Sequence, residues 1–246
     1  MSTKMRALSV CAVALTGGIA SADVIETLTF DDMVHGQIVN TQYTTSHGVT
    51  ISAENFNRDF DLAVAFDTTR RDTRDSDLED PWRVGNLARD TILGRALIIQ
   101  ENNYGTDDGI ANRPDDEGNR PAGTLTFAYD RVMTGFGFDV IDLESTTAEM
   151  SSLDFILEGA IVRSVDFSSF LPWGAYGDPT IEYGDNSANR IRLLTADELA
   201  IDGFDTVRIN VGGSMAFDNI RAVPTPGTMA MLGLGGVCLA RRRRSA

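Results

Sequence analysis

The chain has 246 residues with 36 acidic and 21 basic side chains, which give a formal net charge of −15 at pH 7. Six of the basic residues lie at the two ends, so residues 23–223 carry 15 basic against all 36 acidic residues, a formal charge of −21. A surface this negative repels polyanions, which argues against binding to nucleic acid or to anionic lipid.

The first 22 residues have the pattern of a secretory signal peptide. Lys4 and Arg6 form a positive start, residues 7–20 are mostly small and apolar, and residues 20–22 form a small-x-small cleavage site. We therefore expect cleavage after Ala22; the alternative is a buried first helix. Cys11 and Cys238, the two cysteines, lie in the apolar end segments, so residues 23–223 can form no internal disulfide.

Residues 23–223 alternate apolar and polar side chains in short runs, which is typical of half-buried strands. Loops rich in Gly, Pro, Asn and Asp separate the runs. Thr195 and Glu198 have capping-box spacing and indicate one short helix over residues 195–200. A single all-β domain, a jelly-roll-like β-sandwich, is the fold that these patterns predict. The expected strands lie within residues 49–53, 62–66, 96–100, 124–130, 136–140, 153–157, 160–165, 190–194, 207–211 and 216–223.

Acidic residues gather in three loops that are also rich in Gly, Asn and Pro. Calcium takes six to eight oxygens at about 2.3–2.6 Å from carboxylates, amides and backbone carbonyls, so loops of this composition suit it. Their spacing does not match an EF-hand loop. We predict calcium binding by Asp75 and Asp77 in the first loop, Asp107 and Asp108 in the second, and Asp115 and Asp116 in the third.

Arginines flank these loops and could satisfy the carboxylates without a metal. Arg70, Arg71 and Arg74 lie beside the first acidic loop, and Arg113 and Arg120 lie on either side of the third. The alternative interpretation is therefore that the acids are solvated or paired with arginine.

A further candidate calcium site joins the two ends of the domain. "LTFDD" at 28–32 and "FDNI" at 217–220 resemble the first and last strands of jelly-roll carbohydrate-binding modules. In those modules, acids on the terminal strands hold a structural calcium. The resemblance implies that Asp31, Asp32 and Asp218 share one ion here.

Aromatic residues in turn-like segments are candidates for contact with sugar rings. Trp82 lies in "DPWRVGN", and Trp173 and Tyr176 lie in "LPWGAYGDP". Exposed aromatic faces stack on sugars, so these three residues are the predicted ligand-binding set. The alternative is that they cover one end of the sandwich.

Motifs of enzyme chemistry are missing from the sequence. It has two histidines, His35 and His47, no Gly-x-Ser-x-Gly elbow, no His-Glu-x-x-His and no phosphate-binding glycine loop. A glycoside hydrolase needs only two carboxylates at a suitable separation, and this alternative stays open with Glu144, Glu158 or Glu182. We expect a protein that is not an enzyme.

The last 23 residues have three parts in order. Pro224, Pro226 and Gly227 break any strand, Thr228–Ala240 is apolar and rich in glycine, and four arginines follow. Thirteen residues rise only about 20 Å as a helix, less than a stable membrane span needs. The positive-inside rule would keep Arg241, Arg242, Arg243 and Arg244 in the cytoplasm and leave the domain outside.

This tail resembles the PEP-CTERM sorting signal of Gram-negative bacteria, a Pro-x-Pro-Gly box followed by an apolar helix and an arginine cluster. Thr225 stands where that signal usually has a glutamate. The resemblance implies transient anchoring in the inner membrane, processing by an exosortase-type protease, and residence in the cell envelope or at the extracellular surface, in association with extracellular polysaccharide.

A second resemblance covers residues 61–144. "RALIIQENN", "PDDEGNRPAGTLTFAYD" and "FGFDVIDLE" are similar to an uncharacterised extracellular module of exported bacterial proteins. The expected organisation is a signal peptide at 1–22, a β-sandwich at 23–223 and a sorting signal at 224–246. We expect a non-enzymatic surface or matrix protein that is stabilised by calcium and associated with exopolysaccharide; the alternatives are a carbohydrate-binding module and a secreted glycoside hydrolase.

Overall fold

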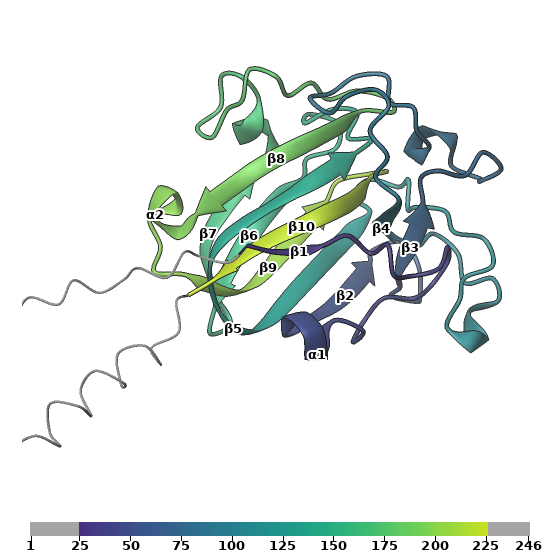
Figure 1. Cartoon of the computed structure of the whole chain (residues 1–246), viewed down its shortest axis with the longest axis horizontal. Helices are drawn as coiled ribbons and strands as arrows, with labels where there is room; N and C mark the ends of the chain where they lie inside the picture. The colour runs from purple at the N-terminus through teal and green to yellow at the C-terminus, as the bar shows by residue number, and fades with distance from the viewer. Residues whose placement is uncertain (1–24, 226–246) are drawn as a thin grey trace, which may run out of the picture.

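The computed structural model describes residues 25–225, which form ten strands with short helical turns between them (Figure 1). The strands are β1 (Glu26–Leu28), β2 (Val49–Asn55), β3 (Ala63–Asp67), β4 (Arg95–Ile99), β5 (Gly123–Ile141), β6 (Ser152–Leu157), β7 (Ala160–Asp166), β8 (Ala188–Thr195), β9 (Phe204–Val211) and β10 (Ala216–Pro224). The helical elements are α1 (Thr44–His47), α2 (Ala196–Leu199) and 3-10 turns at Ser76–Leu78, Thr106–Asp108 and Phe167–Phe170.

The predicted all-β fold is confirmed, and so is the capping box that begins α2, with Thr195 and Glu198 bonded in both directions. Within residues 25–225, no helix is long and apolar enough to cross a bilayer. The predicted signal peptide, with its cleavage site at Ala22, lies outside the described residues. So do the predicted sorting residues Pro226, Gly227 and Arg241–Arg244.

β5 runs through both layers of the sandwich. Its first part, Gly123–Ala128, pairs with β2 on one side and β9 on the other. Its second part, Gly135–Ile141, lies between β8 and β10. One layer is therefore β2-β5-β9-β6-β7, and the other is β8-β5-β10-β4-β3 with β1 also on β10. All of these strand pairs are antiparallel.

The sequence predicts two strands, at 124–130 and 136–140, where the structure has this single strand of 19 residues. The register shifts between Ala128 and Met133, which is where the strand passes from one layer to the other. Residues 129–134 contain no glycine or proline that would end a strand, so the backbone stays extended through the bend.

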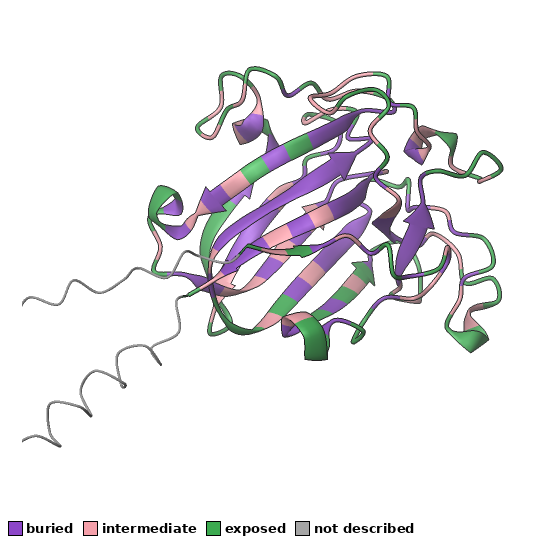
Figure 2. Cartoon of the chain, in the orientation of Figure 1, coloured by how far each residue is buried: buried purple, intermediate pink, exposed green. Residues whose placement is uncertain are grey.

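Phenylalanine rings fill the space between the two layers. Phe136 on β5 lies at the centre, with ring centroids 6.2–6.4 Å from Phe127, Phe155 and Phe204, and 5.8 Å from Phe138. Buried and more exposed residues alternate along β2 and along much of β8, as Figure 2 shows. This alternation, which the sequence predicts, places the apolar faces of both layers against each other.

A second buried cluster lies on the outer side of β3 and β4. Both strands are buried on both faces, because the loops that follow β3 and β4 cover them. Trp82 belongs to this cluster with 1% of its surface exposed, and its Nε1 donates to the Thr91 carbonyl at 2.9 Å. The expectation that Trp82 presents its ring to a sugar is therefore wrong, since the indole fills the space under the loop.

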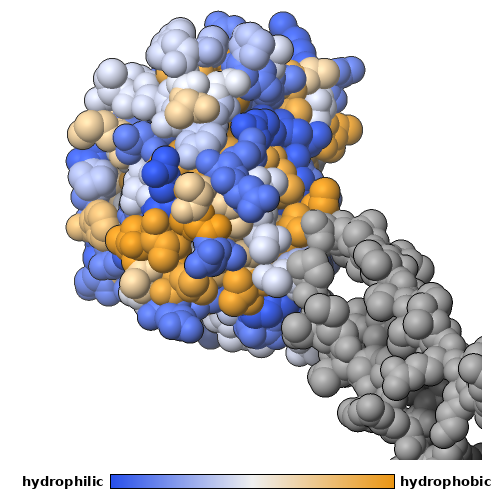
Figure 3. All heavy atoms as spheres, turned by 90° about the vertical axis from the view of Figure 1, so that its left-hand side faces the viewer, coloured by the Kyte–Doolittle hydropathy of each residue, from blue (hydrophilic) through white to orange (hydrophobic). Residues whose placement is uncertain are grey.

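The two ends of the sandwich differ in character. β1 pairs with the end of β10, so the chain enters and leaves the described domain side by side (Figure 1). Apolar side chains gather on this face, as Figure 3 shows, and the exposed ones at the chain ends include Ile25 and Val132, whose carbonyl accepts from the Thr225 amide. The long loops after β3 and β4, which carry the predicted acidic sites, lie at the other end.

Replacing Phe136 with alanine removes the ring that joins both layers. Phe136→Ala should lower the free energy of unfolding by about 3–5 kcal/mol, because it deletes a buried aromatic ring and leaves a cavity. Denaturant unfolding measures the loss. Phe56→Ala, at an exposed position, should change it by no more than about 0.5 kcal/mol; equal losses in the two variants would contradict this account of the core.

Candidate metal centre

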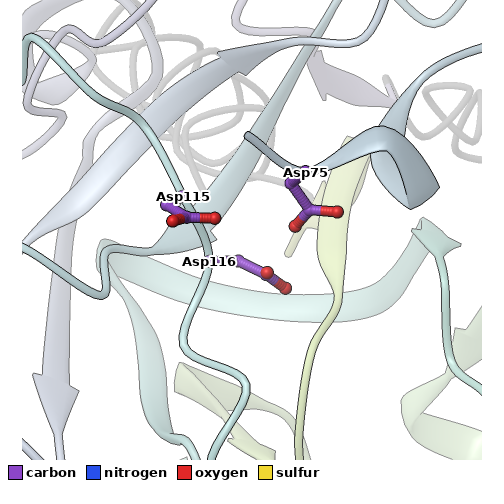
Figure 4. A group of neighbouring side chains, drawn as sticks. All are labelled: Asp75, Asp115 and Asp116. Carbon is purple, nitrogen blue, oxygen red and sulfur yellow. The ribbon is translucent and has the colours of Figure 1, made fainter. Parts of the chain in front are cut away.

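Three carboxylates converge between the loops after β3 and β4. Oxygens of Asp75, Asp115 and Asp116 all lie within 4.8 Å of one another (Figure 4). Two oxygens bound to one calcium at about 2.3–2.6 Å can be at most about 5 Å apart. The three side chains therefore stand at a spacing that one calcium ion could bridge.

The backbone around each acid is held by hydrogen bonds. Asp75 precedes the 3-10 turn Ser76–Leu78, and its Oδ1 accepts from the Asp77 amide at 3.2 Å. Gln100 is fully buried at the end of β4 and forms a bridge with Asp116, while its side chain accepts from the Asp115 amide at 3.2 Å. Buried polar groups of this kind position the acids without a charge of their own.

Asp142 and Ser214 lie beneath the three acids. The Ser214 hydroxyl donates to Asp116 Oδ2 at 2.8 Å and lies 3.3 Å from Asp142 Oδ2. Asp142 follows β5 with a left-handed φ of 61°, and its Oδ1 accepts from the Asn186 amide at 2.6 Å. Asn186 also donates to the carbonyls of Asp77 and Glu79, at 2.9 and 2.8 Å, so five chain segments meet here.

The electrostatics of this cluster favour a cation. Burial, followed by Glu101 and Asp75, raises the pKa of Asp115 to about 6. Burial raises the pKa of Asp142 to about 8, with Asp75 and Asp77 adding to the effect. The pKa of Asp116 is raised well above its usual value by burial and by its hydrogen bond with Asp75. A divalent cation would hold all of these groups in their charged form.

Arginine does not neutralise this cluster, although it does neutralise its neighbours. Arg70 binds Asp72 at 3.0 Å, Arg71 binds Asp80, and Arg120 binds Glu144 and Glu149 at 2.8 and 2.7 Å. Among residues 25–225, no ion pair includes Asp75, Asp115 or Asp116. Pairing with arginine, the alternative interpretation, therefore holds for acids around the cluster and not for the three carboxylates within it.

The other predicted calcium residues of these loops lie outside the group of three. Asp107 and Asp108 are exposed on the 3-10 turn Thr106–Asp108, where Asp108 accepts from the Ile110 amide at 3.0 Å. Asp77 is half-buried, and its pKa is raised by burial and by Asp185 and Asp75. Only Asp75, Asp115 and Asp116 meet the spacing for one ion in the part of the chain that the structure describes.

The acids of the terminal strands lie near each other but in different environments. Asp218 on β10 is fully buried, its Oδ1 has no hydrogen-bond partner among the described residues, and burial, Asp139 and Asp31 raise its pKa to about 9. Asp31 accepts from the Arg95 amide at 3.0 Å, and Asp32 accepts from the Tyr43 hydroxyl. The three carboxylates do not come within the spacing that the first cluster meets.

Trp173 is the one predicted sugar-contacting residue that is widely exposed. It has 80% of its surface exposed and lines a hollow of about 370 Å³ together with Pro172 and Tyr183. Tyr176 is half-buried against the core, and its hydroxyl accepts from Arg163 at 3.2 Å. The structure thus keeps Trp173 as a candidate contact for a ligand and gives Tyr176 a supporting position.

Asp142 and Ser214, which lie against Asp116 in the candidate metal centre, were not predicted from the sequence. Neither residue belongs to an acidic run, so composition offered no signal for them. Asp142 comes directly after the predicted strand at 136–140, at the end of the sandwich where the loops gather. An isolated acid at a strand end was the one hint available.

Comparison with known proteins identifies the tail. Residues 222–244 match the model of the PEP-CTERM protein-sorting motif, so the chain carries this sorting signal. The motif implies processing by an exosortase and export to the cell envelope or surface of a Gram-negative bacterium. No curated protein matches the chain.

Two solved structures resemble the fold at a distance. The K2 cleaved adhesin domain of Lys-gingipain is 12% identical, with a TM-score of 0.40 over 82% of this chain and 98% of that domain. The enzymatically active domain of tailspike protein 4 of bacteriophage CBA120 is 11% identical, with a TM-score of 0.32 over 80% of this chain and 22% of that one. Neither likeness carries an argument about function.

Raised carboxyl pKa values predict how stability changes with pH in chelator. The folded pKa of Asp142 and Asp218, about 8 and about 9, exceeds the unfolded value, so the folded state holds extra protons at pH 7. That stabilisation is lost as the pH rises through these values. The midpoint temperature of thermal unfolding should therefore decrease as the pH is raised from 7 to 9.5.

Asp142→Asn, which keeps the shape but cannot ionise, should make that fall shallower. His35, whose pKa burial lowers, acts in the opposite direction only at lower pH and does not disturb this range. A midpoint that stays constant or rises from pH 7 to 9.5 would contradict the prediction.

Proposed function

We propose that this exported surface protein is not an enzyme and that calcium bound by Asp75, Asp115 and Asp116 stabilises its sandwich. The observation that carries the proposal is the convergence of three carboxylates that no arginine neutralises. Glu101, a further acid, lies near Asp115 and raises the pKa of Asp115, whereas Arg74 is the nearby base that lowers it. A calcium ion supplies the missing positive charge.

Calcium would join parts of the chain that have few other links. Asp75 belongs to the loop that covers the second core, and Asp115 and Asp116 belong to the loop that leads into β5. In the absence of a cation the ionised carboxylates on these two loops repel each other. The proposed ion would therefore join the loop that packs over β3 and β4 to the loop that leads into β5, the strand that both layers share.

A second calcium near the terminal strands is part of the same proposal. Asp31, Asp32 and Asp218 do not all stand within 4.8 Å of one another, so their side chains would have to close around the ion. Asp218 has a buried oxygen without a hydrogen-bond partner among residues 25–225, and Asp31 raises its pKa. A buried carboxylate in this condition is costly unless a cation or a proton compensates it. Asp32, which Tyr43 engages, would supply only its free oxygen.

Contact with extracellular polysaccharide is the proposed role of the exposed surface. Trp173 offers an aromatic face beside a hollow, and the sorting signal, which implies export to the cell envelope or surface, supports a role for that face in contact with polysaccharide. Of the glutamates considered for a hydrolase, Glu144 is held by Arg120 and Glu158 lies in the β6–β7 hairpin. Glu182 lines the hollow beside Trp173, but it is the one acid in that lining, whereas hydrolysis needs two carboxylates. We therefore favour binding over hydrolysis.

Calcium should raise the midpoint of thermal unfolding at constant ionic strength. An ion present at about 100 times its Kd stabilises the folded state by about 2.7 kcal/mol, because it binds only the folded chain. The Asp115→Asn/Asp116→Asn variant should lose most of the rise. Magnesium at the same concentration should give a smaller rise, since magnesium demands near-ideal octahedral geometry and loses its water reluctantly.

Asp107→Asn/Asp108→Asn is the matched control, with the same change of charge at exposed positions. It should respond to calcium as the native chain does. Asp218→Asn reports the second ion separately. Coincident unfolding curves in calcium and in chelator would overturn the calcium proposal.

Trp173→Ala should weaken retention on an acidic or neutral polysaccharide matrix by about three- to tenfold, because it removes a stacking face. Affinity electrophoresis through gels that contain the polysaccharide measures the retardation. Ile92→Ala removes an apolar side chain of comparable exposure and should leave it unchanged. Identical mobility of both variants and the native chain would remove Trp173 from the binding surface.

A further inference from the structure

A hollow of about 300 Å³ lies next to the proposed metal centre, between residues 70–74 and residues 110–114. Its lining is mostly polar and basic, in a domain whose formal charge is −21. The polar side chains that line it are His35, Arg70, Thr73, Arg74, Asn112 and Arg113, together with one acid, Asp72, which Arg70 pairs. Positive side chains concentrated on one hollow of an acidic domain need an explanation.

Two of these arginines have no acidic partner. Arg74 and Arg113 are exposed, and within residues 25–225 neither takes part in an ion pair. Arg70 differs, because it holds Asp72 with two hydrogen bonds of 3.1 and 3.0 Å. The hollow therefore keeps two guanidinium groups available for a ligand.

The position of Arg113 is set by an aromatic ring at the rim. Its guanidinium lies 4.8 Å from the centroid of Tyr104, a cation–π contact that leaves its N–H groups free to donate. The Asn112 amide donates to the Tyr104 carbonyl at 2.9 Å, which fixes the two rim residues together. Tyr104 is itself exposed and lies outside the lining of the hollow, so its part is to hold Arg113.

His35 adds a neutral donor to the hollow. Its Nδ1 accepts from the Asp67 amide at 3.0 Å, so the ring proton sits on Nε2. The edge-to-face contact with Phe66, at 5.4 Å between centroids, holds the ring in place. Together with the arginines, His35 makes a lining that donates hydrogen bonds and carries positive charge.

Such a lining selects an anionic group, and planar guanidinium groups match a carboxylate in particular. The volume lies at the small end of ligand pockets, which suits a single ring. Asn112 and Thr73 supply polar groups suited to hydroxyls. We propose that this hollow binds a carboxylate-bearing sugar, a uronic acid residue of an acidic extracellular polysaccharide.

The proposal rests on the proposed function for the class of partner, a polysaccharide outside the cell. The acidic charge of the rest of the domain does not prevent it, because at 0.15 M salt fields from exposed charges are screened over about 8 Å. Arg74 directly precedes Asp75, and Arg113 lies two residues before Asp115. Calcium at the neighbouring site would therefore hold the two arginine-bearing segments in place.

Calorimetric titration of the purified full chain with the trimer of galacturonic acid tests the proposal, at fixed calcium and physiological salt. The fully methyl-esterified trimer has the same rings without the charge and should bind at least about tenfold more weakly. Arg74→Gln and Arg113→Gln should each weaken binding of the acid by about fivefold or more. Arg89→Gln removes one exposed arginine that does not line the hollow and should leave binding unchanged.

Absence of binding to the acid, equal binding of its ester, or unaffected Arg74 and Arg113 variants would each overturn the proposal. A short polyglutamate peptide that binds as tightly, with the same dependence on both arginines, would assign the hollow to acidic peptides instead. Separate measurements test the proposed function, so that its failure can be told apart from failure of this proposal. The calcium-dependent rise in unfolding midpoint should persist in both arginine variants, and Trp173→Ala should leave trimer binding intact.

Discussion

The fold of this protein depends on the continuity of β5. Four strands pair directly with it, β2 and β9 along its first part and β8 and β10 along its second, so the register of both layers is set by one segment. Phe127 and Phe136 point from its two parts into the same core, 6.2 Å apart between ring centroids. A shift of one residue would turn these rings outward, since the side-chain period of a strand is two.

The charged loops follow from a packing requirement at one side of this sandwich. β3 and β4 are apolar on both faces, so long loops must cover their outer side, and these loops carry the acids and the arginines to which we assign the proposed sites. Burial of Leu78 and Trp82 draws the first loop down onto the strands and brings Asp75 toward Asp115 and Asp116. The carboxylates become close neighbours because apolar side chains beside them pack.

Strand positions were predictable because they depend on local alternation. The runs around residues 125, 155 and 209 pack their apolar faces inward, as their period indicates, and the capping box of α2 needs only two residues three apart. Trp82 was misread because a tryptophan between Pro81 and Gly85 has the local pattern of an exposed turn. Its burial depends on residues of β3 and β4 that the local sequence does not show.

The sequence alone determined the all-β class, the strongly acidic charge and the sorting signal, because composition, period and a contiguous motif are local properties. Tertiary structure alone decided which acids meet. Asp75 and Asp116 are 41 positions apart and touch, whereas Asp107 and Asp108, much nearer to Asp116 in the chain, remain exposed and separate. The reason is physical: ion binding requires oxygens within a few ångströms, and only the packing of loops onto β3 and β4 sets such distances.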